Sequence, residues 1–282
     1  MKCDAASSLL FVNGELLSAP DAKLFDRIGG NSVYEVIKLL RGIPLFFEDH
    51  MDRLRRSIAL LGIKIDISNR RVRTEISCLM EKTGCRNINV KLVWYPAVEK
   101  SIFLTYFIQQ DIPAREAYQQ GVHTILFNGE RKNPHVKAIK TSFRERATTS
   151  RDASGAYEAL LVDSNGHISE GTRSNIFYLI DNQLCTPPSG SVLLGVTRQH
   201  VMSICREIGI KIRQRKLHRE DLNLLEGAFI TGTTIDVLPI GSIEHVKIAS
   251  ASHPTIESIA QAFDRHVAEI VEKNTRNIRS SI

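Results

Sequence analysis

Residues 158–188, which read EALLVDSNGHISEGTRSNIFYLIDNQLCTPP, decide the fold. Short apolar runs alternate there with tight-turn signals, which is the pattern of successive antiparallel strands. The run Glu158–Asp163 predicts a strand, and Ser164-Asn165-Gly166 predicts a hairpin with a two-residue turn. Glu170 then falls at the end of the returning strand, before a glycine. A carboxylate in that place either faces a functional site or is a solvated edge charge, and spacing alone favours the solvated charge.

The same stretch continues with two more predicted strands. Residues 175–180 predict the first, and Asp181-Asn182 predicts the turn into the second, at residues 184–186. Pro187-Pro188 ends the run, because proline cannot donate a hydrogen bond to a sheet.

Composition narrows the class of protein. The chain has 282 residues, enough for one large or two ordinary domains, with 43% hydrophobic and 24% charged residues. No apolar run approaches the roughly 20 residues that a membrane span requires. An acidic residue follows closely on Met1, where a signal peptide would need an apolar core, so we expect a cytoplasmic location and no membrane partner.

Cysteine usage and charge exclude further classes. The five cysteines form no CxxC motif and are odd in number, which favours reduced thiols over a disulfide framework or a zinc site, so no metal is predicted. The formal net charge is +6. Basic residues are nevertheless scattered among acidic ones, and the densest basic cluster, 211–219, is followed by Glu220 and Asp221. We therefore expect a solvated surface and no nucleic-acid partner.

The N-terminal part of the chain predicts an α+β domain. Its turn and cap signals are Asn13-Gly14 for a hairpin, Ser68 at the start of a helix and Gly84 at its end. The expected strands are residues 33–40, 44–46, 88–95 and 101–108, and the expected helices are residues 51–61 and 68–83. We expect a small domain over residues 1–112 and a linker over 113–121.

The remaining residues, 122–282, predict a second and larger domain. Expected strands cover residues 122–127, 136–140, 211–215, 228–231 and 237–240 in addition to those of the opening stretch. Expected helices cover residues 144–151, 196–208 and 255–271, and the last ten residues are expected to fray.

The motif SEGTRSNIF, with Glu170, Thr172 and Asn175, resembles the signature of the class IV (fold type IV) pyridoxal-phosphate enzymes. That family includes branched-chain aminotransferases, D-amino acid aminotransferases and aminodeoxychorismate lyases. The resemblance implies an α+β fold of two domains, a smaller N-terminal α/β sandwich and a larger C-terminal pseudo-barrel. It also implies pyridoxal 5'-phosphate as the cofactor and a homodimer.

The resemblance places the catalytic lysine at Lys140, in a short strand that ends in Ile139-Lys140. Lys140 would form the Schiff base with the cofactor and move the substrate proton as general base and acid. The residues alone leave open whether Lys137 or Lys140 is buried, since two strand residues three apart face opposite sides. With Lys140 in the site, Lys137 is expected to point to solvent.

Arg53, in the run HMDRL, matches the H-x-x-R-L in which the family's arginine binds the cofactor phosphate. The alternative is a surface arginine paired with Glu48 or Asp49. Glu170 matches the carboxylate that keeps the cofactor ring nitrogen protonated. A glycine before a helix and a Gly-Thr-Thr turn offer backbone amides and hydroxyls to the phosphate. The other expected cofactor residues are Ser174, Asn175, Val196, Thr197, Thr233 and Thr234.

Three residues are expected to contact the substrate: Tyr34, Lys38 and Arg173. The alternative for Tyr34 and Lys38 is sheet packing and a surface charge. Arg173 replaces a residue that is small in the family, so it either binds a carboxylate or crowds the pocket. Residues 94–97, Trp-Tyr-Pro-Ala, carry neither the R-x-H of the D-amino acid enzymes nor the R-G-x-G of the lyases, which leaves the substrate open.

The leading hypothesis is pyridoxal-phosphate-dependent transamination between an amino acid and a 2-oxo acid, with a branched-chain-like or D-amino acid-like donor. The alternative on the same scaffold is a lyase that releases pyruvate from an aminodeoxychorismate-like substrate. A third hypothesis, a cofactor-free basic protein that binds RNA or a partner surface, predicts salt-dependent retention and no yellow colour.

Overall fold

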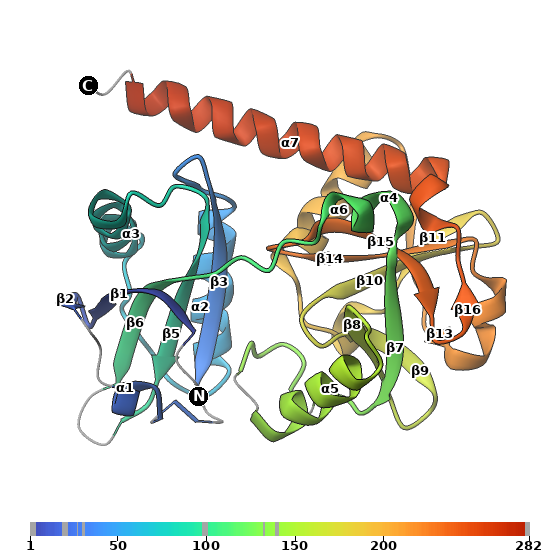
Figure 1. Ribbon diagram of the computed structural model, residues 1–282, viewed down its shortest axis with the longest axis horizontal. Helices are drawn as coiled ribbons and strands as arrows, with labels where there is room; N and C mark the ends of the chain where they lie inside the picture. The colour runs from blue at the N-terminus through green and yellow to red at the C-terminus, as the bar shows by residue number, and fades with distance from the viewer. Residues whose placement is uncertain are drawn as a thin grey trace. The chain divides into compact units, whose positions relative to one another are not determined.

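The computed structural model describes residues 4–18, 22–26, 28–29, 32–97, 101–131, 133–138 and 141–279. They divide into two compact units (Figure 1). Unit 1 comprises Met1–Asp111, Val136–Thr141 and Val267–Ile282, and unit 2 comprises Ile112–His135 and Ser142–His266. The domain limits expected from the sequence stay a prediction. No helix in the described part of the chain is long and apolar enough to cross a membrane.

Unit 1 contains a six-stranded sheet in the order β2-β1-β6-β5-β3-β4, with antiparallel neighbours throughout. Helices α2 and α3 pack against β3 and β6 (Figure 1). The elements are β1 (Ala5–Val12), β2 (Glu15–Ser18), α1 (Ala22–Asp26), β3 (Val33–Leu40), β4 (Ile43–Pro44), α2 (Phe47–Ala59), α3 (Asn69–Thr83), β5 (Ile88–Tyr95) and β6 (Ile102–Ile108).

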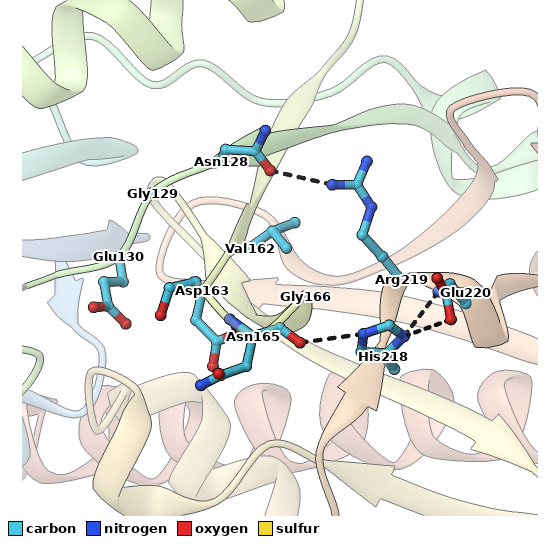
Figure 2. Close-up of a pocket in the computed structure, with 11 residues that line it drawn as sticks. Asn128, Gly129, Glu130, Val162, Asp163, Asn165, Gly166, His218, Arg219 and Glu220 are labelled. Carbon is cyan, nitrogen blue, oxygen red and sulfur yellow. Dashed lines mark hydrogen bonds and ion pairs between the residues drawn. The ribbon is translucent and has the colours of Figure 1, made fainter.

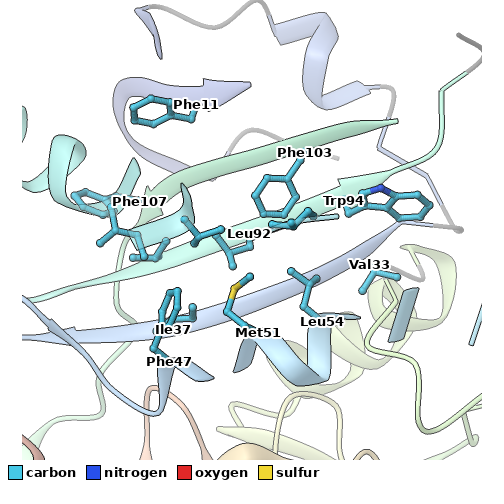
Figure 3. Packing of buried hydrophobic residues seen from close by; sticks show 14 of the residues in the cluster. Phe11, Val33, Ile37, Phe47, Met51, Leu54, Leu92, Trp94, Phe103 and Phe107 are labelled. Carbon is cyan, nitrogen blue, oxygen red and sulfur yellow. The ribbon is translucent and has the colours of Figure 1, made fainter. Parts of the chain in front are cut away.

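The two faces of this sheet bury different side chains, because successive residues of a strand point to opposite sides. Val33 and Ile37 of β3 join a large apolar core with Met51 and Leu54 of α2 (Figure 3). Tyr34 belongs to a second cluster on the opposite face, which includes several aromatic residues of β5 and β6. Position 35 of β3 therefore faces the helices, and position 34 faces away from them.

Local signals in unit 1 act as the sequence predicts. Asn13 (φ 51°) and Gly14 (φ 95°) both adopt the left-handed conformation that a two-residue hairpin requires. The Ser68 hydroxyl caps α3 by accepting the Arg71 N–H at 3.2 Å, and Gly84 ends the helix at φ 71°. The expected strands 33–40 and 88–95 are confirmed at both ends.

Unit 2 is built on a curled ten-stranded sheet in the order β12-β11-β10-β14-β15-β7-β8-β9-β13, with β16 paired to β15. The strands are β7 (Val122–Asn128), β8 (Glu158–Val162), β9 (His167–Gly171), β10 (Asn175–Ile180), β11 (Gln183–Thr186), β12 (Ile212–Gln214), β13 (Leu217–His218), β14 (Gly227–Gly232), β15 (Asp236–Ile243) and β16 (Val246–Lys247). Its core includes the stacked rings of Phe177 and Phe229, whose centroids are 4.9 Å apart.

The helices of the second half are α4 (Arg115–Gln120), α5 (Thr141–Ala153), α6 (Val196–Glu207) and α7 (Pro254–Arg279), with short 3-10 turns η1 (Ser189–Ser191), η2 (Arg219–Leu224) and η3 (Ser250–Ser252). Helix α4 lies in the segment expected as a linker, and α7 continues eight residues beyond its expected end at residue 271. Of the expected strand 136–140, the structure shows one isolated bridge, Val33 to Ala138. Ile139 and Lys140 lie outside the described residues.

The hairpin between β8 and β9 differs from the expected two-residue turn. Gly166 (φ 79°) is left-handed there and Asn165 is not, and the Asp163 N–H donates to the His167 carbonyl at 2.9 Å. The Asp163 carboxylate accepts the N–H groups of Asn165 and His167, both at 2.9 Å, and these bonds favour the longer turn. By contrast, Asp181 (φ 54°) and Asn182 (φ 55°) form the predicted two-residue turn.

Candidate active site

Glu170, the penultimate residue of β9, is a buried carboxylate. Its Oε2 accepts the Leu193 N–H at 3.0 Å and the Asn175 Nδ2 at 3.3 Å, and its Oε1 lies 2.7 Å from Arg131 Nε in an ion pair. Only 3% of the Glu170 side chain is exposed, against 12% for Arg131. The sequence alternative of a solvated edge charge is therefore wrong, and Glu170 is a buried anion with a cationic neighbour.

Asn175, the first residue of β10, connects Glu170 to the start of α6. Besides Glu170, its Nδ2 donates to the Leu193 carbonyl at 2.9 Å. A Cβ at Gly195 would lie 2.0 Å from Asn175 Oδ1, so only glycine allows this close approach. The predicted residues Asn175, Val196 and Thr197 are thus brought together with Glu170.

The N-terminus of α6 presents backbone amides beside this carboxylate. Its N-cap is Gly195, and within the described residues no side chain caps the helix. The first backbone bond of the helix runs from the Gln199 N–H to the Gly195 carbonyl at 3.0 Å. Val196 and Thr197 are both buried there. An uncapped helix N-terminus favours anions, because its first N–H groups have no partner inside the helix.

The turn after β14 forms a second border of the same region. A Cβ at Gly232 would lie 3.6 Å from the Arg173 carbonyl oxygen, which places this turn against the turn that follows Glu170. Thr231 Oγ1 is buried without a hydrogen-bond partner among the described residues. The predicted residues Thr233 and Thr234 follow directly and are half-buried.

Tyr118 of α4, which the sequence did not single out, holds this second turn. Its hydroxyl donates to the Ile235 carbonyl at 3.2 Å. Burial raises the pKa of Tyr118, and the nearby charge of Asp236 raises it further. The phenol therefore stays protonated and remains a donor. Only the fold reveals this residue, because Tyr118 and Ile235 are 117 residues apart.

Arg198 is a second residue that sequence reasoning missed. It lies in the first turn of α6 and is 2% exposed. Its guanidinium donates to the Pro187 carbonyl at 3.1 Å and to Thr186 Oγ1 at 3.4 Å. Burial lowers the pKa of Arg198, while the charge of Glu170 opposes that shift. The run Gly195-Val196-Thr197-Arg198 predicts a helix start with phosphate donors at Val196 and Thr197, and it gives no signal for the arginine.

In unit 1, Arg53 of α2 points to the sheet and not to Glu48 or Asp49. Its Nε and Nη2 donate to the two oxygens of Glu35, each at 2.7 Å, and His50 Nδ1 lies 2.8 Å from Glu35 Oε2. Glu35 and His50 are completely buried. The sequence alternative of a surface pair is wrong, and Arg53 instead belongs to a buried charged cluster with a parallel, two-bond contact.

The contacts within this cluster shift the pKa values of Glu35 and His50. Burial alone would raise the pKa of Glu35, but the charge of Arg53 and the hydrogen bonds from His50 and Arg53 outweigh it and lower that pKa to about 2. Burial lowers the pKa of His50, although contact with Glu35 opposes the shift. At neutral pH the cluster therefore holds an anionic Glu35, a cationic Arg53 and a neutral His50.

Tyr34 lies on the opposite face of β3, with two ammonium groups near its ring. Lys137 Nζ is 4.9 Å and Lys91 Nζ 5.8 Å from the ring centroid. Lys137, expected to point to solvent, is half-buried instead. Lys91 is buried and pairs with Asp4. Lys38 is half-buried on β3 and lies opposite Asn89 of β5. It is two positions after Val36, the residue of β3 that lies opposite Lys91.

Arg173 and Ser174 occupy the turn between β9 and β10. The Arg173 guanidinium lies 5.0 Å from the centroid of the Tyr157 ring, and its Nη2 is 3.4 Å from the Tyr157 carbonyl. The Ser174 hydroxyl donates to Glu158 Oε2 at 2.8 Å. Their predicted roles stay predictions, as does that of Lys140. Glu158 is a third residue whose importance the sequence did not indicate.

A separate cavity of about 670 Å³ lies at the other end of β9 (Figure 2). It is bordered by the tip of the β8–β9 hairpin, the end of β7 and the start of η2. His218 Nε2 lies 3.1 Å from the Asn165 carbonyl oxygen, and Arg219 donates to Asn128 Oδ1 at 3.2 Å. None of the predicted site residues lines this cavity.

Comparison with known proteins identifies the family. The family model for amino-transferase class IV matches residues 32–243, about three quarters of the chain. The chain belongs to the class IV aminotransferases. It is therefore an enzyme, and pyridoxal phosphate is the cofactor of its family.

Two curated relatives illustrate the range of the family. A branched-chain-amino-acid aminotransferase of Salmonella typhimurium is 26% identical over 281 residues, covering 90% of this chain and 91% of its own. A D-alanine aminotransferase of Bacillus licheniformis is 26% identical over 253 residues, covering 84% of this chain and 88% of its own.

Solved structures confirm the α+β fold of the class IV enzymes. A branched-chain aminotransferase of Thermoproteus uzoniensis, solved with norvaline, superposes with a TM-score of 0.81 at 22% identity, covering 95% of this chain and 97% of that one. A putative 4-amino-4-deoxychorismate lyase of Legionella pneumophila superposes with a TM-score of 0.76 at 22% identity, covering 86% of this chain and 92% of that one.

The residues of unit 2 fit the cofactor of this family. The phosphate of pyridoxal phosphate needs donors, and the uncapped start of α6 and the unpartnered Thr231 hydroxyl supply two kinds. The protonated ring nitrogen needs an anionic partner, and Glu170 is a buried carboxylate bonded to Asn175 and to the Leu193 N–H just before α6. The glycine at position 195 leaves the space that a side chain would fill.

Proposed function

We propose that the protein transfers the amino group of a branched-chain-like or D-amino acid-like donor to a 2-oxo acid. The observation that carries the proposal is the buried Glu170, held by Arg131 and Asn175 beside the uncapped start of α6. A carboxylate beside an anion-binding helix end is the pairing that a cofactor with a cationic ring and an anionic phosphate requires.

Each cofactor residue has one role in this proposal. When bound, pyridoxal phosphate supplies an electron sink for the negative charge that develops at the substrate α-carbon. Glu170 holds a proton on the ring nitrogen, and Arg131 is its ion-pair partner at 2.7 Å. The amides or hydroxyls of the two turns, at Val196, Thr197, Thr233 and Thr234, bind the phosphate. Arg53 keeps the phosphate role that the family resemblance gives it, with its Nε and Nη2 also bonded to Glu35. Ser174 and Asn175 line the ring side of the site.

Lys140 is the proposed catalytic residue. Its amine would take the proton from the substrate α-carbon and return it to the cofactor side, as general base and then general acid. Lysine suits this task because its pKa falls readily when the amine is desolvated or lies near other cations.

The Tyr34 face of unit 1 is the proposed substrate face. Lys91 and Lys137 bring two ammonium groups within 6 Å of the Tyr34 ring, and burial strengthens their attraction for a carboxylate. Asp4 already pairs with Lys91, so Lys137 contributes the larger share of this attraction. Lys38 would add a third charge at the border of this face. Arg173 remains a candidate for a second carboxylate contact. An anionic substrate, such as an amino acid or a 2-oxo acid, fits this charge.

The test is the visible spectrum of the protein with pyridoxal phosphate, before and after adding L- and D-amino acids one at a time. A band that shifts with one amino acid would support transamination and would identify the donor and whether it is the L- or the D-form. A band that no amino acid moves would favour the lyase, to whose fold the chain is also similar. Absence of a band in the wild type, even with added pyridoxal phosphate, would contradict the role of Lys140, whereas the Lys140→Ala variant is expected to lose the band.

Assembly and location are proposed on separate grounds. A homodimer follows from the family resemblance, and light scattering of the holoenzyme would test it. A cytoplasmic location is favoured by the free thiols of Cys78, Cys85, Cys185 and Cys205, since an oxidising compartment favours disulfides. Fractionation of cells that express the tagged chain would test this location.

A further inference from the structure

Glu158, the first residue of β8, is a completely buried carboxylate. One of its hydrogen bonds comes from the N–H of its neighbour Ala159, at 2.9 Å to Oε1, and all the others come from a single turn. Oε1 accepts the N–H of Thr172 at 3.2 Å and its hydroxyl at 2.6 Å. Oε2 accepts the Arg173 N–H at 3.3 Å and the Ser174 hydroxyl at 2.8 Å. The two oxygens thus bind three successive residues.

These residues connect Glu170 to Asn175. The turn is wrapped closely around the carboxylate, since a Cβ at Gly171 would lie 2.8 Å from Glu158 Oε2. Arg131 holds the same turn from another direction, donating to the Thr172 carbonyl at 2.7 Å. The path of the turn decides whether Asn175 can reach Glu170. Glu158 holds that path together with two backbone bonds, from the Gly171 N–H to the Ser174 carbonyl at 2.8 Å and from the Thr172 N–H to the Ala159 carbonyl at 3.1 Å.

Charge pairing does not explain Glu158. Within the described residues it makes no ion pair, and the guanidinium of Arg173 lies over Tyr157 instead. Burying a carboxylate is costly unless hydrogen bonds satisfy it. A carboxylate accepts and never donates when ionised, so it matches a turn that offers N–H and O–H groups. The Glu158 side chain is therefore suited to holding the backbone of the 171–174 turn in one conformation.

We propose that Glu158 is a positioning residue that fixes the 171–174 turn and thereby orients Glu170 toward the cofactor ring. This inference rests on the proposed role of Glu170. Glutamine at position 158 keeps the volume but presents an amide N–H to the Arg173 N–H, so two donors would face each other. The turn would move, and Glu170 and Asn175 would move with it.

The experiment measures pyridoxal phosphate binding and the pH titration of its visible band in the Glu158→Gln holoenzyme. We expect the dissociation constant to rise about tenfold, because an unsatisfied buried donor must be relieved by moving the turn. We also expect the midpoint of the titration to shift by about half a pH unit, because the Glu170 charge changes its distance from the ring.

Glu75→Gln is the matched control. Glu75 is also a buried carboxylate, which accepts Arg71 Nε at 2.8 Å and the Thr105 hydroxyl at 2.6 Å, and neither of these partners is assigned to the cofactor or the substrate. We expect this variant to melt at a lower temperature while its cofactor affinity and titration midpoint stay at the wild-type values. A purely structural role for Glu158 predicts the same behaviour for Glu158→Gln.

The outcomes separate this inference from the proposed function. If the wild type shows no visible band, both are overturned. If the wild type shows the band and Glu158→Gln keeps its affinity and midpoint, only the positioning role is overturned. If Glu158→Gln does not fold, Thr172→Val, which removes one bond to Glu158 and keeps the backbone, should weaken cofactor binding about threefold. An unchanged affinity in Thr172→Val would then overturn the positioning role.

Discussion

Glu35 of β3 in unit 1 and Glu158 of β8 in unit 2 are both completely buried carboxylates on strands, yet their partners differ. Glu35 faces a guanidinium and an imidazole, whereas Glu158 faces backbone N–H and hydroxyl groups. Cationic partners lower a carboxylate pKa and couple folding to pH. Neutral donors in one turn instead constrain the path of the backbone. The same side chain therefore serves charge balance in one unit and geometry in the other.

The largest expected effect breaks the charged cluster. Glu35→Gln removes the anion that Arg53 and His50 contact, and we expect the free energy of unfolding of unit 1 to fall by about 3–5 kcal/mol, as for other broken buried pairs. Trp94, the chain's single tryptophan, is buried in the unit 1 core and reports this unfolding by fluorescence in urea.

Glu48→Gln is the control for that measurement. Glu48 pairs with Arg73 on the surface, with 66% of its side chain exposed. Surface pairs contribute at most about 1 kcal/mol, so this variant should unfold close to the wild type. An equal loss in both variants would contradict the view that the buried cluster stabilises unit 1.

The second test is how the free energy of unfolding of unit 1 changes as the pH falls. The pKa of Glu35 falls from 4.5 to about 2 on folding, so its contribution is fully present above pH 4.5 and is lost as the pH falls toward about 2. The amount is about 3 kcal/mol. His50, whose pKa is lowered from 6.5, acts in the same direction, because protonation below its unfolded pKa favours the unfolded chain. Trp94 fluorescence at decreasing pH should show this loss in the wild type and a flatter curve in Glu35→Gln.

The third test concerns function in unit 2. Glu170→Gln should lower kcat by about a hundredfold while the affinity for pyridoxal phosphate changes much less, because the ring charge matters more in the transition state than in binding. Glu158→Gln should change affinity and kcat together. If the two variants behave alike, the distinction between a contacting and a positioning carboxylate does not hold.

The smallest expected effect lies at the second turn. Tyr118→Phe removes the hydroxyl that donates to the Ile235 carbonyl and should cost about 0.5–1.5 kcal/mol. We expect a lower melting temperature and a modest loss of cofactor affinity, both measured on the holoenzyme. Equilibrium dialysis against pyridoxal phosphate would detect the second effect, and no change in either quantity would exclude a role for Tyr118 in shaping the turn.

Much of the fold could be predicted because its signals are local. Asn13-Gly14 specifies a hairpin by its own backbone preferences, and Ser68 with Gly84 specifies both ends of α3. The hairpin after β8 was predicted with the wrong turn, since the Asp163 carboxylate selects a longer one. Helix α4 was missed because it is short and has no buried face of its own.

The site could be predicted only where a motif carried it. Glu170 and Asn175 lie in one recognisable run, and the structure places them in contact. Glu35 was not expected as the partner of Arg53, since the two are 18 residues apart and meet only when α2 packs on β3. Glu158 likewise has only the signal of a strand residue, because its partners in the turn are 14 to 16 positions further along the chain.

The division of the chain into interleaved segments has a consequence for biosynthesis. Unit 1 needs residues 136–141 and 267–282 in addition to its first 111, whereas unit 2 ends at His266. A ribosome releases the chain from its N-terminus, so the last segment of unit 1 emerges after all of unit 2 has been made. The part synthesised first is therefore completed last, and a chain cut short near residue 266 would leave unit 1, not unit 2, unfinished.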